Sequence, residues 1–212
     1  MTSEDPGERI LAAAFELFDE HGLLDVSVEG IVAKAQASKS TFYQRFGSKE
    51  KVVVAYLEHG LKNLGALVET AKADGGLAGA EGLLAVFDVF DEWSRRSVVA
   101  LSSILRVLNE LEPTDSLRLA VVEFLDRSRA RVAAAVAESG LDSPVEFTRS
   151  FQIIARGALV TAVEGDAEAA ARARVMAGKL IEAHSLKSPF DAGTAEVSVR
   201  GSRPPAGVAE HG

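Results

Sequence analysis

A run of basic side chains lies close together in a chain that is acidic overall. The 212 residues carry a formal charge of −8, yet residues 34–51 alone carry +4. The basic residues of this range are Lys34, Lys39, Arg45, Lys49 and Lys51, against Glu50 alone. Ammonium and guanidinium groups bind phosphate, whereas the total charge would repel it. The sequence therefore predicts a local nucleic-acid site and argues against a protein that coats nucleic acid non-specifically.

The residues that most enzymes and metal sites need are absent or far apart in the sequence. The chain has no cysteine, which excludes disulfides, thiolate zinc sites and cysteine nucleophiles. Its histidines, which are too far apart to form a metal-binding pair on one helix, are His21, His59, His184 and His211. No paired carboxylates, nucleophile–base pair or glycine-rich phosphate loop can be distinguished. We therefore expect no enzyme activity, no metal and no cofactor.

Composition and apolar run lengths favour a soluble protein. With 47% hydrophobic and 25% charged residues, the chain has the composition of a globular domain. The N-terminus is acidic, and charged residues or glycine interrupt every apolar run well before the ~18–20 residues that a membrane helix needs. We expect a cytoplasmic protein with no membrane partner.

Short helical patterns position the basic residues. The predicted helices cover residues 8–21, 28–35, 39–45 and a stretch from 49 onward. Gly22 ends the first helix, and Ser27, Ser38 and Ser48 are suitable N-caps for the other three. Two short helices joined by a three-residue turn and preceded by a supporting helix predict a helix-turn-helix, whose second helix enters the DNA major groove.

The rest of the chain continues in helical patterns after a glycine-rich stretch at residues 71–82. These patterns cover residues 80–95, 97–111, 115–138, 145–164 and 167–184, and no stretch alternates convincingly with period two. We expect an all-α protein of about nine helices. The predicted divisions are a DNA-binding domain at 1–48, a ligand-binding and dimerisation domain at 49–185 and a flexible tail at 186–212.

The N-terminal residues match a known family in order and spacing. They are Ile10 to Phe18, Gly22, Ser27, Ile31, Ala35, Ser38-Lys39, Thr41-Phe42-Tyr43, Phe46 and Ser48-Lys49-Glu50. With these residues the chain resembles the TetR family of bacterial transcriptional repressors, whereas the C-terminal two-thirds match only in helical character and length. Gln36 stands where the family generally has glycine in the turn, so a non-glycine residue must tolerate an unusual backbone there. Arg45 stands where histidine is common.

Geometry assigns roles within the predicted helix-turn-helix. A seven-residue helix is ~10 Å long at 1.5 Å per residue, so one copy reads only a few base pairs and specific binding needs a dimer. The expected base-reading residues are Lys39, Ser40, Thr41 and Gln44. The expected phosphate contacts are Tyr43, Arg45 and Lys49, with the capping Ser27 and Ser38 close to the DNA backbone. The resemblance implies the same role for Tyr43 and Lys49, and we expect Phe42 and Phe46 in the core.

Two apolar sets in the larger domain suggest further contacts. Residues that could line a pocket for a small-molecule effector are Phe87, Phe90, Trp93, Leu101, Ile104, Leu105 and Phe124, although aromatic residues at this spacing are also typical of plain core. As in the family, we expect the last two helices to pair with their copies in a dimer. The expected contacts are Phe147, Phe151, Ile154, Ala158, Ala162, Ala173 and Ala177, and the alternative is that both helices serve only the internal core.

Three functional hypotheses follow. The leading one is a dimeric repressor of the TetR type that binds a pseudo-palindromic operator of double-stranded DNA and is released by a small-molecule effector. The second is a helical small-molecule-binding protein with a vestigial DNA surface, and the least favoured is a helical enzyme. In the first, the tilt of the helix that begins at Lys49 would link pocket occupancy to the spacing of two recognition helices.

Overall fold

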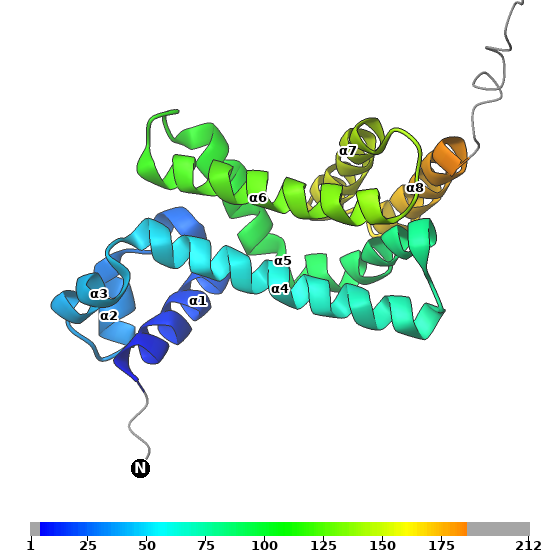
Figure 1. Ribbon diagram of the computed structural model, residues 1–212. Coiled ribbons are helices and arrows are strands. Elements are labelled where there is room, and N and C mark those ends of the chain that lie inside the picture. Colours follow the sequence, from blue (N-terminus) through cyan, green and yellow to red (C-terminus); the bar gives the residue numbers. More distant parts are fainter. Residues whose placement is uncertain (1–4, 186–212) are drawn as a thin grey trace, which may run out of the picture.

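The structure, a computed structural model, describes residues 5–185, without the side chains of residues 91–98, 100 and 101. All regular structure in this part of the chain is helical (Figure 1). The helices are α1 (Pro6–Asp25), α2 (Val28–Lys34), α3 (Lys39–Phe46), α4 (Lys49–Gly75), the 3₁₀ helix η1 (Gly79–Leu84), α5 (Ala85–Glu110), α6 (Ser116–Glu138), α7 (Pro144–Val163) and α8 (Ala169–Ser185). The prediction of an all-α fold with about nine helices is confirmed, and the predicted tail at 186–212 lies outside the described residues. Within residues 5–185, no helix combines the length and the apolar composition needed to span a membrane.

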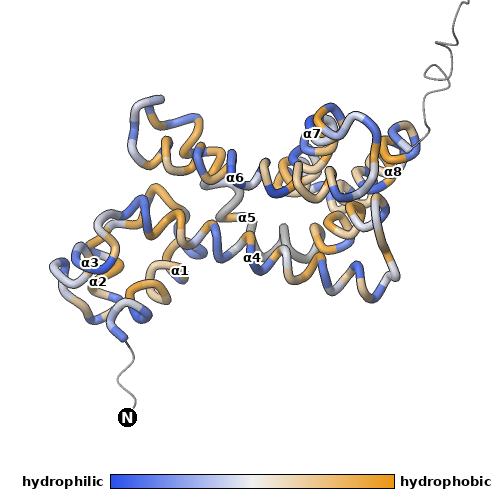
Figure 2. The backbone as a smooth tube through the Cα atoms, in the orientation of Figure 1, coloured by the Kyte–Doolittle hydropathy of each residue, from blue (hydrophilic) through white to orange (hydrophobic). Residues whose placement is uncertain are grey.

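Local signals set the helix boundaries in the first quarter of the chain. The Oγ atoms of Ser27, Ser38 and Ser48 each accept a hydrogen bond from the backbone N–H three residues later, at 3.1, 3.0 and 3.4 Å. These are the N-caps of α2, α3 and α4, as predicted. Gly47 ends α3 with a φ of 77°, a backbone that glycine adopts readily. Hydrophilic and hydrophobic residues recur along each helix, as expected of amphipathic helices that pack on one side (Figure 2).

The structure corrects one predicted helix boundary in the part of the chain after α4. The two helices predicted at 80–95 and 97–111 are instead η1 followed by one continuous helix, α5. Neither glycine nor proline occurs between residues 83 and 110, so nothing interrupts the helical hydrogen bonds near residue 96. The predicted helices at 115–138, 145–164 and 167–184 correspond to α6, α7 and α8.

The helices enclose two hydrophobic cores. The first core joins α1, α2 and α3 to the first half of α4, the end of α5 and the first half of α6, around buried side chains such as Phe18 and Phe42. The second joins the start of α5 and the end of α6 to α7 and α8, around Phe87, Phe147 and Phe151. Figure 1 shows the two corresponding lobes, with α4, α5 and α6 running between them. The functional division at 48/49 stays a prediction, since α1–α3 share their core with parts of all three long helices.

Candidate nucleic-acid interface

Helix α3 packs into the protein through aromatic side chains on one side and is exposed to solvent on the other. Phe42 is fully buried, and its ring centroid lies 5.7 Å from that of the partly buried Phe46. Tyr43 follows Phe42 in the sequence but is 51% exposed, with its ring edge-on to the Phe42 ring. Because neighbouring residues on a helix point about 100° apart, burying Phe42 turns Tyr43 outward. The helix therefore presents a polar edge to solvent.

The structure brings the predicted DNA-contacting residues to this surface. Those that are exposed are Ser27, Ser38, Lys39, Ser40, Tyr43, Gln44 and Arg45, and those that are partly exposed are Thr41 and Lys49. The Thr41 hydroxyl lies 2.9 Å from Ser38 Oγ and is engaged in the α3 cap. Its methyl group is the part left for a contact with thymine.

Lys49 has a structural contact beside its predicted one. Its Nζ donates a hydrogen bond to the Leu24 carbonyl at 3.4 Å, which links the start of α4 to the end of α1. Partial burial lowers the pKa of the Lys49 ammonium. The contact with Leu24 therefore holds the Lys49 side chain at the junction of α1 and α4.

The turn between α2 and α3 has the unusual backbone expected at Gln36. Gln36 has a φ of 50°, in the left-handed region that favours glycine. The N–H of Gln36 donates to the Ala33 carbonyl at 3.2 Å, and that of Ala37 to the Val32 carbonyl at 2.9 Å. This pair of bonds is a Schellman motif, in which the residue at the Gln36 position is usually glycine. The motif closes α2 and sets the direction in which the chain enters α3.

Replacing Gln36 by glycine is expected to raise the free energy of unfolding by about 1 kcal/mol, because the left-handed backbone strains any residue that has a Cβ. Chemical denaturation followed by circular dichroism measures the change. Ala33→Gly, at an exposed position inside α2, is the control and should lower the free energy by about 1 kcal/mol. A loss of stability in Gln36→Gly would contradict the left-handed turn.

Three basic residues of the interface are paired with carboxylates from other elements. Lys34 pairs with Glu16 of α1 at 2.9 Å, Lys39 with Glu29 of α2, and Arg45 with Asp5, the N-cap of α1, at 2.6 Å. The sequence range 34–51 did not include these acids. When they are counted, the local charge of +4 falls to +1. The reading face is the exposed surface of the predicted DNA contacts between Ser27 and Lys49, and in the free protein it is nearly neutral. Lys51 is in no ion pair among the described residues.

The interface is connected to the rest of the protein by α1 and α4. Gly22 breaks α1 with a φ of 81° and a ψ of 177°, and a Cβ placed there would lie 2.3 Å from Ser103 Oγ of α5. Three residues later, Asp25 pairs with Arg106 at 2.7 Å, and this guanidinium holds the pKa of the Asp25 carboxyl below its usual value. On α4, the Glu50 carboxylate accepts a hydrogen bond from the Ser116 hydroxyl of α6 at 3.0 Å.

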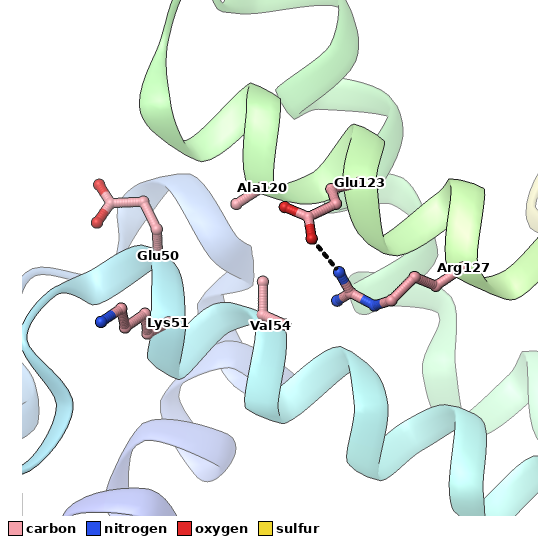
Figure 3. A pocket seen from close by; sticks show the side chains of 6 residues that line it. All are labelled: Glu50, Lys51, Val54, Ala120, Glu123 and Arg127. Carbon is pink, nitrogen blue, oxygen red and sulfur yellow. Dashed lines mark hydrogen bonds and ion pairs between the residues drawn. The ribbon is translucent and has the colours of Figure 1, made fainter.

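A cleft of about 250 Å³ separates the first turns of α4 from α6 (Figure 3). It is lined by Glu50, Lys51, Val54, Ala120, Glu123 and Arg127. The charged groups are largely satisfied within the protein, since Arg127 binds both Glu123 at 2.7 Å and Glu58 at 3.3 Å. The cleft is therefore a gap between two helices that are joined by polar contacts on either side of it.

The residues predicted to line an effector pocket are not all brought together. Phe87 and Phe90 pack edge-to-face in the second core, whereas Phe124 and Ile104 belong to the first. Leu105 is 40% exposed. The side chains of Trp93 and Leu101 lie outside the described residues. The described aromatic residues thus pack as core, and the effector pocket stays a prediction.

The predicted dimer contacts lie mostly inside the protomer. Those that are buried are Phe147, Phe151, Ala158, Ala173 and Ala177, and Ile154 and Ala162 are partly buried. All of them except Ala162 belong to the second core, to which α7 and α8 contribute. The large apolar residues that α7 and α8 leave exposed are Val145, Ile153, Val160, Val175 and Met176. A hollow of about 410 Å³ on α8 is lined by two of these, Val175 and Met176, together with Glu168, Ala171 and Arg172.

Comparison with known proteins identifies the N-terminal segment. The profile of the bacterial regulatory proteins of the tetR family matches residues 10–56. Uncharacterised HTH-type transcriptional regulators of Mycobacterium bovis and Mycobacterium tuberculosis are 36% identical over 55 residues. This match spans 26% of the chain and 27% of each relative. The family profile covers the region that contains most of α1, α2, α3 and the start of α4.

Solved structures resemble the chain over most of its length. A TetR-family transcriptional regulator from Streptomyces coelicolor superposes with a TM-score of 0.63 at 21% identity, covering 85% of this chain and 96% of that one. A TetR transcriptional regulator from Legionella pneumophila gives 0.62 at 19%, covering 85% and 100%. The reduced form of Escherichia coli NemR gives 0.61 at 20%, covering 84% and 97%. At these identities the likeness establishes the shared fold.

Proposed function

Because residues 10–56 form a helix-turn-helix domain of the TetR family on a chain with the TetR fold, we propose that this protein regulates transcription by binding an operator as a dimer. In this proposal it acts as a repressor, and a small-molecule effector releases it from a pseudo-palindromic site in double-stranded DNA. The family profile covers only residues 10–56, so the regulatory activity of the whole chain is part of the proposal.

The observation that carries the proposal is the two-sided character of α3. Its apolar side is buried through Phe42, and its opposite edge presents Lys39, Ser40 and Gln44 to solvent. Lysine can donate to guanine and glutamine can pair with adenine in the major groove. Tyr43, Arg45 and Lys49 flank this edge with groups that bind phosphate.

The second copy is proposed to pack against α7 and α8. Ile153 on α7 is 74% exposed, and Val175 and Met176 on α8 are 61% and 57% exposed. Large apolar side chains exposed together are typical of an interface rather than of a monomer surface. A dimer that buries them would present two copies of α3 to successive major grooves, about 34–36 Å apart.

Helix α4 is proposed to carry the effector response. It begins directly after α3 and passes from the first core, at Leu61, to the second, at Leu64. Gly60 and Gly65 flank this crossing, and apart from the adjacent residues and backbone of α4 itself, no atom lies within 4 Å of a Cβ built at either position. Glycine in a helix without a packing reason makes it easier to bend. A change in the second core could therefore alter the direction of α4 and the spacing of the two reading helices.

DNA binding is tested by capture of genomic fragments with the purified protein, followed by gel shifts on the captured site. Lys49→Ala is expected to weaken binding to every sequence and to reduce the salt slope of binding by about 0.9, because one phosphate contact is lost. Tyr43→Ala is expected to weaken binding with little change in slope, and Gln44→Ala to relax the preference at one base position.

Lys62→Ala provides the control, since Lys62 is an exposed lysine of α4 beyond the reading face. It should leave both affinity and slope unchanged. Thermal unfolding of each variant separates a lost DNA contact from a lost contact between Lys49 and Leu24. Capture of no preferred fragment would favour the alternative of a small-molecule-binding protein with a vestigial DNA surface.

A further inference from the structure

The pair of Glu29 and Lys39 differs from the other two ion pairs of the reading face. It joins the first turn of α2 to the first residue of α3, and so links the two helices of the helix-turn-helix. Both side chains are more than half exposed, at 63% and 55%. Lys34, in contrast, is 34% exposed and pairs with α1. Glu29 and Lys39 are thus placed where a bound duplex would meet both groups.

Hydrogen bonding stabilises both charges of this pair. The ammonium of Lys39 lowers the pKa of the Glu29 carboxyl, and the carboxylate raises the pKa of Lys39. Both groups therefore stay charged across the physiological pH range. A lysine ammonium has three N–H donors, so Lys39 can keep Glu29 as a partner and still donate to O6 or N7 of guanine. A phosphate gains less from Lys39, because the carboxylate already neutralises that charge and repels the phosphate.

On this basis we propose that Glu29 is a specificity-determining residue: it holds the Lys39 ammonium for a base edge and disfavours its use as a phosphate contact. The inference rests on the proposed DNA binding. Glu29 itself is a positioning residue, since it acts through Lys39. Without the carboxylate, Lys39 becomes an ordinary mobile cation that any DNA sequence can recruit.

The test compares the full-length protein with Glu29→Gln, which keeps the size of the side chain but removes its charge and one of its two acceptor oxygens. Fluorescence anisotropy measures affinity for a captured operator duplex and for a scrambled duplex of equal length, between 50 and 200 mM salt. We expect Glu29→Gln to bind the scrambled duplex about three- to five-fold more tightly, the upper part of the range of an exposed ion pair. Operator affinity should change by less than about two-fold, because two effects oppose each other. The freed charge of Lys39 attracts the DNA more strongly, but Lys39 is no longer held in position for its base contact. The salt slope on the scrambled duplex should steepen by about 0.9.

Two variants separate this role from the general effect of removing a negative charge. Glu138→Gln removes an exposed carboxylate at the end of α6, outside the three ion pairs of the reading face, and should change neither the ratio of affinities nor the slope. In a Lys39→Gln background, Glu29→Gln should have no effect on the ratio. An equal gain on both duplexes, or an unchanged slope, would overturn the role of Glu29. If the wild-type protein prefers no captured fragment over the scrambled duplex, the proposed function fails, and this inference with it.

Discussion

Gly22→Ala is expected to lower the free energy of unfolding by about 3 kcal/mol, because two separate costs meet at this position. The backbone of Gly22 has a φ of 81° and a ψ of 177°, a region that only glycine occupies without strain. The added methyl group would also lie 2.3 Å from the Oγ of Ser103, whose side chain is buried against α1. Urea denaturation followed by circular dichroism measures the loss.

A second substitution separates the two costs. Removing the hydroxyl with Ser103→Ala leaves the Ser103 Cβ at 3.5 Å as the nearest atom, an ordinary contact distance. The double variant should therefore recover the steric part of the loss and keep the backbone part of about 1–3 kcal/mol. Gly60→Ala is the matched control and should stabilise the protein by up to about 1 kcal/mol, because its surroundings are open. A stable Gly22→Ala would mean that α1 does not break as described.

Two contacts join α1 to α5 at this position. Gly22 lets the two helices approach closely, and the ion pair between Asp25 and Arg106 lies one turn further along α1. Arg106 binds Glu110 on its own helix at 2.9 Å, which fixes the guanidinium for Asp25. In the proposed effector response, these contacts would pass a displacement of α5 to α1 and so to the helix-turn-helix.

Local chemistry explains which features could be predicted from the sequence. The N-caps at Ser27, Ser38 and Ser48 depend only on residues within three positions, and the left-handed backbone at Gln36 depends on the turn that closes α2. The helix-turn-helix therefore follows from short-range signals. The break in α1 at Gly22 was expected as an end of the helix, whereas one further turn to Asp25 follows it, held by packing against α5.

Long-range pairing explains what could not be predicted. Asp5 and Arg45 are forty positions apart and meet only because α1 and α3 pack on one core. The near-neutral reading face could therefore not be inferred from the charge of residues 34–51. Likewise, the periodicity of α7 shows that it has two apolar faces but not which of them the protomer covers. Phe147 and Phe151 pack inward, and Ile153 is left exposed.

Ile153→Glu and Met176→Glu are each expected to dissociate the dimer and to weaken operator binding by about 100-fold, since a monomer engages one half-site and loses the gain from two linked contacts. Both side chains are exposed in the protomer, so the substitutions should leave its fold and thermal unfolding almost unchanged. In the proposed interface, however, association would remove the new carboxylate from water, and this desolvation opposes it. Sedimentation velocity at micromolar concentration measures the oligomeric state, and gel shifts measure the affinity.

Leu119→Glu distinguishes a specific interface from a general effect of surface charge. Leu119 is 54% exposed, close to the 57% of Met176, but lies on α6 and away from the exposed faces of α7 and α8. This variant should remain dimeric and keep its operator affinity. If the wild-type protein sediments only as a monomer, the dimer proposal is rejected. If Ile153→Glu and Met176→Glu remain dimeric while Leu119→Glu dissociates, the second copy packs against α6, and the spacing of the two α3 helices must be derived from that surface.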